Sequence, residues 1–154
     1  MDEKEIALLE SDLLESYELV KQIYEYILGE KATFKDRIQD LNSMAYHLHN
    51  LYGAHEQLFE IVARFFENQI TGNRYHVDLL RRMKTEIKGV RPALIPSITY
   101  ELLDELQAFR HFFRHAYTAK LDADRVERVV RIAIKLKERF RRDMECFLAQ
   151  LGPV

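Results

Sequence analysis

The residues best suited to chemistry gather in one short stretch, Phe109-Arg110-His111-Phe112-Phe113-Arg114-His115-Ala116-Tyr117. Its histidines suit proton transfer near neutral pH, and its arginines offer fixed forks of donors to phosphate oxygens. No carboxylate within the stretch balances these groups. Such clustering favours anion binding and phosphoryl transfer. The alternative is the ordinary solvated side of an amphipathic helix, although such a face would be expected to carry Glu, Lys and Gln.

On an ideal helix with about 100° per residue, this stretch has two faces. The apolar side chains share one arc, which we expect to face the core: Phe112, Ala116, Phe109, Leu102, Phe113 and Leu106. Arg110, Arg114 and Tyr117 share a stripe on the opposite side, beside His111 and His115. Arg110 and His115 lie about 140° apart, so one straight helix does not direct both to a single phosphate. Either the helix unwinds near Ala116, or two copies share the site across a two-fold axis.

Other familiar site types are not favoured. No two glycines are close enough for a phosphate-binding loop, and no strand-to-helix turn is expected that would support a hydrolase triad. His47 and His49 face apart on one expected helix, and His55 lies two turns beyond His47. We therefore interpret these histidines as surface or core-edge residues, and we expect neither a metal ion nor a cofactor.

Composition indicates the fold that must position the stretch. Only 5 glycines and 3 prolines occur in 154 residues, while 47% of residues are hydrophobic and 31% charged. These values predict an all-α antiparallel bundle of about five helices, forming one domain over residues 1–154. The single cysteine, an acidic start without a signal peptide and the lack of a long apolar run predict a cytoplasmic protein without a membrane span.

Apolar periodicity and capping signals predict the helix boundaries. The first helix is expected over residues 3–28, and a capping box at Thr33 and Asp36 should open a long second helix, which Gly53 could kink or divide. A third helix is expected over residues 75–88. Ser97 should cap the fourth helix, with Glu101 in its first turn and fraying near residue 118. The fifth should start at Asp122 or Asp124 and end near residue 151.

Charge is distributed unevenly along the chain. Residues 1–30 carry nine acids and two lysines, whereas residues 110–142 carry eleven lysines and arginines against four acids. The basic part could attract a polyanion such as nucleic acid. The alternative is that the first and fifth helices pack side by side and neutralise each other.

The stretch from Arg110 to Tyr117 resembles the R-x4-H-x-Y motif of HepT, the toxin branch of the HEPN superfamily. HEPN domains are helical bundles, often dimeric, in which R-x4–6-H marks metal-independent ribonucleases. The likeness in fold covers essentially the whole chain, and the trailing tyrosine adds specificity to the motif. The chain departs from the pattern at His111, where Asn or Asp is commonest in the superfamily.

The resemblance implies a metal-independent endoribonuclease toxin of a type II-like or type VII toxin–antitoxin pair. His115 would act as acid and base, Arg110 would stabilise the phosphorane, and His111 and Arg114 would position RNA. Partners would be the RNA substrate, a second copy in a homodimer, and a minimal nucleotidyltransferase antitoxin. That antitoxin would adenylylate Tyr117.

Two other function classes stay open on the sequence. One is a non-catalytic HEPN-type module that binds nucleotide or accompanies a nucleotidyltransferase. The other is a helical adaptor whose basic face binds another protein. Intact Arg110 and His115 favour the ribonuclease, because a companion subunit does not need both. A neighbouring reading frame for a small nucleotidyltransferase would support the first two classes and not the adaptor.

Overall fold

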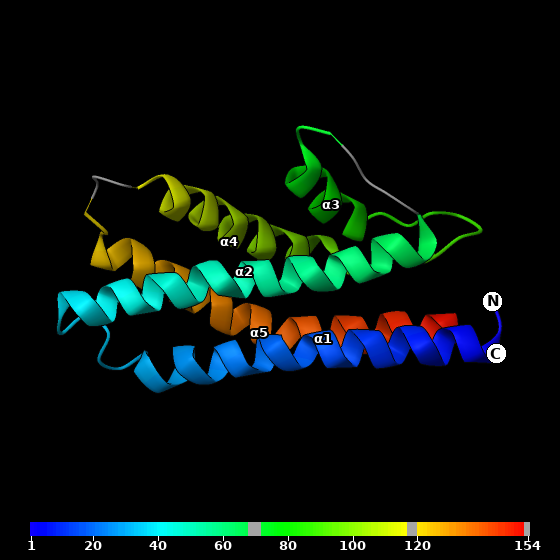
Figure 1. Ribbon diagram of the computed structural model, residues 1–154, viewed down its shortest axis with the longest axis horizontal. Coiled ribbons are helices and arrows are strands. Elements are labelled where there is room, and N and C mark those ends of the chain that lie inside the picture. The colour runs from blue at the N-terminus through cyan, green and yellow to red at the C-terminus, as the bar shows by residue number, and fades with distance from the viewer. Residues whose placement is uncertain (68–71, 117–119, 153–154) are drawn as a thin grey trace.

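A computed structural model describes residues 1–67, 72–116 and 120–152 of the chain. Over these ranges the chain forms five helices: α1 (Glu3–Glu30), α2 (Ile38–Phe66), α3 (Tyr75–Met83), α4 (Ser97–His115) and α5 (Ala123–Leu151) (Figure 1). Outside the helices, one isolated antiparallel bridge joins Ile87 and Arg91. The prediction of an all-α bundle is confirmed.

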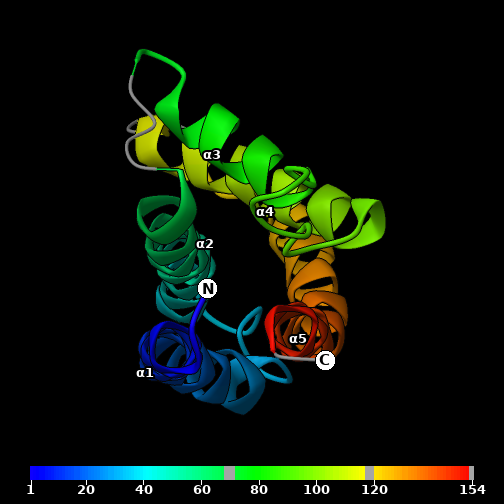
Figure 2. The ribbon, with the colours of Figure 1, turned by 90° about the vertical axis from the view of Figure 1, so that its right-hand side faces the viewer.

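Helix α2 is the centre of the bundle because it contacts each of the other four helices. It runs antiparallel to α1 and α4, as the end-to-end course of the ribbon shows (Figure 1). Viewed along the long axis, α1, α2, α4 and α5 surround a shared core, and α3 lies outside α2 and α4 (Figure 2). Leu48, Leu51 and Phe59 of α2 are fully buried in this core.

Local sequence signals explain where α1 and α5 begin. Asp2 accepts a hydrogen bond from the Glu5 amide while the Glu5 carboxylate accepts one from the Asp2 amide, which forms a capping box. Asp122 caps α5 by accepting a bond from the Asp124 amide, so the expected start at Asp122 is confirmed. The expected end of α5 near Leu151 is also confirmed.

The expected capping box at Thr33 and Asp36 is wrong. The amides of Thr33 and Phe34 both bond to the Glu30 carbonyl, so this segment forms turns that continue from the end of α1. Helix α2 instead begins at Ile38, after Arg37 in an extended conformation. Gly53 lies within one continuous helix and does not divide it.

Helices α3 and α4 also differ from the expected boundaries. Helix α3 ends at Met83 rather than near residue 88, and the chain then turns back through Gly89, whose φ of 78° suits glycine. Ser97 is the first residue of α4 rather than its cap, and Pro96 precedes it without a side-chain cap. No acidic residue, Glu101 included, lies in the first turn of α4. The expected fraying at Thr118 lies outside the described residues.

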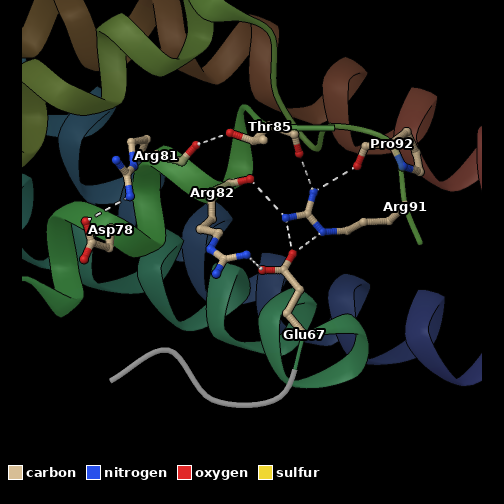
Figure 3. A network of polar contacts seen from close by, with 7 residues as sticks. All are labelled: Glu67, Asp78, Arg81, Arg82, Thr85, Arg91 and Pro92. Carbon is tan, nitrogen blue, oxygen red and sulfur yellow. Dashed lines mark hydrogen bonds and ion pairs between the residues drawn. The ribbon is translucent and has the colours of Figure 1, made fainter. Parts of the chain in front are cut away.

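A buried arginine holds α3 against the end of α2 (Figure 3). The Arg91 side chain is fully buried and forms an ion pair with Glu67. Its guanidinium donates further bonds to the backbone carbonyls of Arg82, Thr85 and Pro92, at 2.9–3.0 Å. Glu67 also pairs with Arg82 at 3.2 Å. This network therefore fixes the position of α3 relative to α2.

The acidic first helix and the basic fifth helix are neighbours, as one of the two interpretations of the charge pattern expected (Figure 1). The Tyr24 hydroxyl of α1 donates to the Ala133 carbonyl of α5 at 2.7 Å, and Tyr17 stacks on Phe140. Within the described ranges, however, no α1 carboxylate forms an ion pair with an α5 side chain. Apolar packing and this hydrogen bond, rather than ion pairs, therefore join the two helices.

Among the described residues, no helix is sufficiently long and apolar to cross a lipid bilayer.

Candidate functional site

Arg110 points from α4 toward α2. The helical projection predicted that it would lie on the side of α4 opposite the core, and that prediction is wrong. Its side chain is only 17% exposed, and its Nη1 lies 3.2 Å from Glu56 Oε1. The guanidinium also lies over the Tyr52 ring, 5.6 Å from its centroid. The projection failed because the α2 surface that faces α4 carries a carboxylate and an aromatic ring, both of which attract an arginine inward.

The other three described motif residues remain at the surface. His111, Arg114 and His115 are exposed, and the two imidazole rings lie 4.5 Å apart, one helical turn from each other. Within the described ranges, none of the three forms an ion pair with a carboxylate. The planes of the two rings are tilted by 57° to each other. Tyr117 lies outside the described residues.

Two residues that the sequence analysis did not single out complete the surroundings of Arg110. Glu56 is 8% exposed and accepts a second contact through Oε2, which lies 2.8 Å from His76 Nδ1 of α3. His76 is 52% exposed. One signal for Glu56 was available: it follows Tyr52 by four residues, so it lies on the apolar side of α2. A carboxylate on a buried face needs a cationic partner. Nothing local indicated His76.

Helix α3 is held beside Glu56 by a second contact with α2. The Tyr75 hydroxyl donates to Glu60 Oε1 at 2.8 Å, and the Tyr75 ring packs edge-on against His76. Desolvation, together with the hydrogen bond to Glu60, raises the pKa of Tyr75 to about 12, so its hydroxyl stays protonated. Burial likewise raises the pKa of Tyr52. These two phenols therefore stay uncharged.

The remaining histidines of α2 have structural environments. His49 packs against Phe113, and desolvation, assisted by the charges of Arg110 and Arg114, lowers its pKa. His47 is half-buried against Tyr26 of α1, and His55 is fully buried. In the described part of the chain, no group of three histidine, cysteine or carboxylate side chains is arranged to hold a metal ion.

A row of five cations follows one side of α5: Arg128, Arg131, Lys135, Arg139 and Arg142. We call this row the α5 basic stripe. The residues recur at helical spacing and extend over about 21 Å. Arg128 pairs with Glu105 of α4 at 3.0 Å, and nearby Arg125 lies over the Phe112 ring, so the stripe begins beside the motif helix. A row of this kind attracts a polyanion.

The end of α4 thus carries two groups of polar side chains on different sides. Arg110 and His76 share the Glu56 carboxylate between α2, α3 and α4. His111, Arg114 and His115 form an exposed surface of two imidazoles and one guanidinium. Together they offer donors to an anion and imidazoles for proton transfer, as phosphodiester cleavage requires.

The family model described as "HepT-like protein" matches residues 43–151, which include most of α2 and all of α3, α4 and α5. No curated protein and no solved structure gives a significant match.

Proposed function

Because the chain belongs to the HepT-like protein family, we propose that it is a metal-independent endoribonuclease toxin of a toxin–antitoxin pair. One observation carries the proposal. The motif helix leaves two imidazoles and an arginine exposed at its end, without a carboxylate partner in the described chain, beside an arginine held on Glu56. An ordinary solvated helix face would carry balanced charges instead.

Each motif residue has a distinct role in this proposal. His115 removes the proton from the 2′-hydroxyl, which then attacks the adjacent phosphorus atom. Arg110 stabilises the charge of the phosphorane; Glu56 uses only part of its guanidinium, which has five N–H donors. His111, Arg114 and the α5 basic stripe bind the backbone. The product carries a 2′,3′-cyclic phosphate, and DNA resists cleavage because it lacks the 2′-hydroxyl.

Three partners belong to the same proposal: RNA as the substrate, a minimal nucleotidyltransferase as the antitoxin, and a second copy of the chain. The second copy answers a geometric need, because Arg110 points toward α2 while His115 lies on a different side of α4. A two-fold axis near α4 would bring Arg110 of one copy close to His115 of the other. Light scattering of the active protein would reveal a dimer, and an active monomer would contradict this arrangement.

A non-catalytic companion subunit of a nucleotidyltransferase is the second candidate. The specific observation in its favour is that Arg110 is largely buried and already paired with Glu56. A structural arginine of this kind stabilises a helix packing without contacting a substrate.

Expression without a partner separates the two candidates. We expect the wild-type chain to stop growth and to fragment cellular RNA, and His115→Ala to do neither. His47→Gln is the matched control. It also removes one imidazole, but His47 lies on α2 and packs on Tyr26 of α1. Purified wild-type protein should cleave RNA in excess EDTA and leave 2′,3′-cyclic phosphate ends. Intact RNA, or activity that EDTA abolishes and a divalent ion restores, would refute the proposed function.

A further inference from the structure

We infer that His76 is the general acid of the proposed cleavage reaction, positioned for that role by Glu56. The inference rests on the proposed function and adds to it a residue from outside the motif. Its basis is one buried carboxylate, that of Glu56, which contacts both His76 and Arg110.

The Glu56 carboxylate places the side chains of Arg110 and His76 next to each other. Oε1 accepts from Arg110 Nη1 at 3.2 Å and Oε2 accepts from His76 Nδ1 at 2.8 Å. Since the two oxygens of a carboxylate are only about 2.2 Å apart, a phosphate that reaches Arg110 also lies close to His76. The carboxylate is only 8% exposed, so neither partner is held by a freely moving side chain.

The same contact determines which nitrogen of His76 faces the solvent. Because Nδ1 donates to Glu56, Nε2 is the nitrogen available to a ligand, and the side chain is 52% exposed. A carboxylate behind an imidazole fixes the orientation of the ring and the nitrogen that faces the ligand. The bond from Tyr75 to Glu60 and the ion pair of Arg91 with Glu67 anchor both ends of α3. His76 therefore presents a proton at a fixed position.

Cleavage of RNA needs both a base and an acid, and His115 can supply only one of them at a time. In the proposed step, the 2′-oxygen forms a bond to phosphorus and its proton goes to His115 of the second copy, which the two-fold axis brings close to Arg110. The bond from phosphorus to the 5′-oxygen breaks, and that oxygen takes the Nε2 proton of His76. His76 becomes neutral and His115 becomes charged, so the proton count balances. Exchange with water restores both before the next turnover.

The test compares two substrates that differ in their need for an acid. RNA has a poor leaving group, whereas uridine 3′-(4-nitrophenyl phosphate) releases a nitrophenolate that needs no proton. For His76→Ala we expect kcat/KM on RNA to fall by about 10²–10⁴-fold, with little change on the nitrophenyl ester. The basic limb of the pH–rate profile should also disappear. Glu56→Gln should give a smaller loss on RNA, because the imidazole remains but loses its carboxylate.

Controls separate this inference from the proposed function. His47→Gln removes an imidazole that also lies near a glutamate, Glu30 at 3.7 Å, and should leave both substrates unaffected. Circular dichroism of each variant would detect a failure to fold, and His76→Gln provides a second, more conservative substitution at the same position. If wild-type protein cleaves RNA and His115→Ala does not, the proposed function stands. Equal activity of His76→Ala and wild type, or an equal loss on both substrates, would then overturn the role of His76 alone. Inactive wild-type protein would overturn both.

Discussion

The stability of the fold should decrease between pH 6.5 and pH 4 because of one buried histidine. His55 of α2 is fully buried and packs edge-on against Phe140, with 4.8 Å between the ring centroids. Its Nδ1 donates to the Leu51 carbonyl at 2.9 Å, whereas its buried Nε2 has no partner among the described residues. A proton added at Nε2 would therefore be buried without an acceptor.

Desolvation lowers the pKa of His55 from 6.5 to about 4, even though the bond to Leu51 acts in the opposite direction. The unfolded chain binds the proton near pH 6.5 and the folded chain only near pH 4. Stability from the neutral imidazole is thus complete above pH 6.5 and is lost as the pH falls toward 4. A shift of this size corresponds to about 3 kcal/mol, or a fall in Tm of about 6–12 °C for a chain of this length.

Urea unfolding of wild type and His55→Leu at several pH values would measure this effect. Leucine cannot titrate, so the variant should lose about 3 kcal/mol less than wild type between pH 6.5 and pH 4. His111→Gln is the control, because exposed His111 should leave the wild-type slope unchanged. If wild type and His55→Leu show parallel pH dependence, the assignment of the acid sensitivity to His55 is refuted.

Two further predictions concern the support of α3 and the motif tyrosine. Arg91→Met leaves Glu67 with Arg82 as its one ion-pair partner in the described chain and removes the guanidinium donor from three carbonyls, so we expect a loss of about 3–5 kcal/mol, measured as a lower urea midpoint. An exposed pair offers the contrast: Arg141→Met, which removes its contact with Glu145, should cost less than about 1 kcal/mol. Co-expression with the nucleotidyltransferase should add adenylate to Tyr117, as peptide mass spectrometry would detect, and Tyr117→Phe should stay toxic. Silenced protein without adenylate would instead indicate steric inhibition.

Local sequence signals determined the helices and the motif. Apolar residues at spacings of three and four, such as Leu13, Tyr17 and Val20, face the core because they share one side of α1. Asp122 determined the start of α5 through its own side chain. The motif lies at the end of α4, a position that the apolar spacing of this helix predicted. The family match agrees with the resemblance on which the proposed function rests. Each of these features depends on residues within a few positions of one another.

Tertiary packing decided where Arg110 points and which residues it meets. Glu56 lies 54 residues from Arg110 and 20 residues from His76, so no periodicity within one helix relates the three. A helical projection defines the sides of α4 but not the chemistry of the helix that packs against it. Arg110 turned inward because α2 places a carboxylate there, and burial makes a charged pair more favourable than an isolated charge. The sequence alone therefore identified the motif, and only the folded chain joined it to Glu56 and His76.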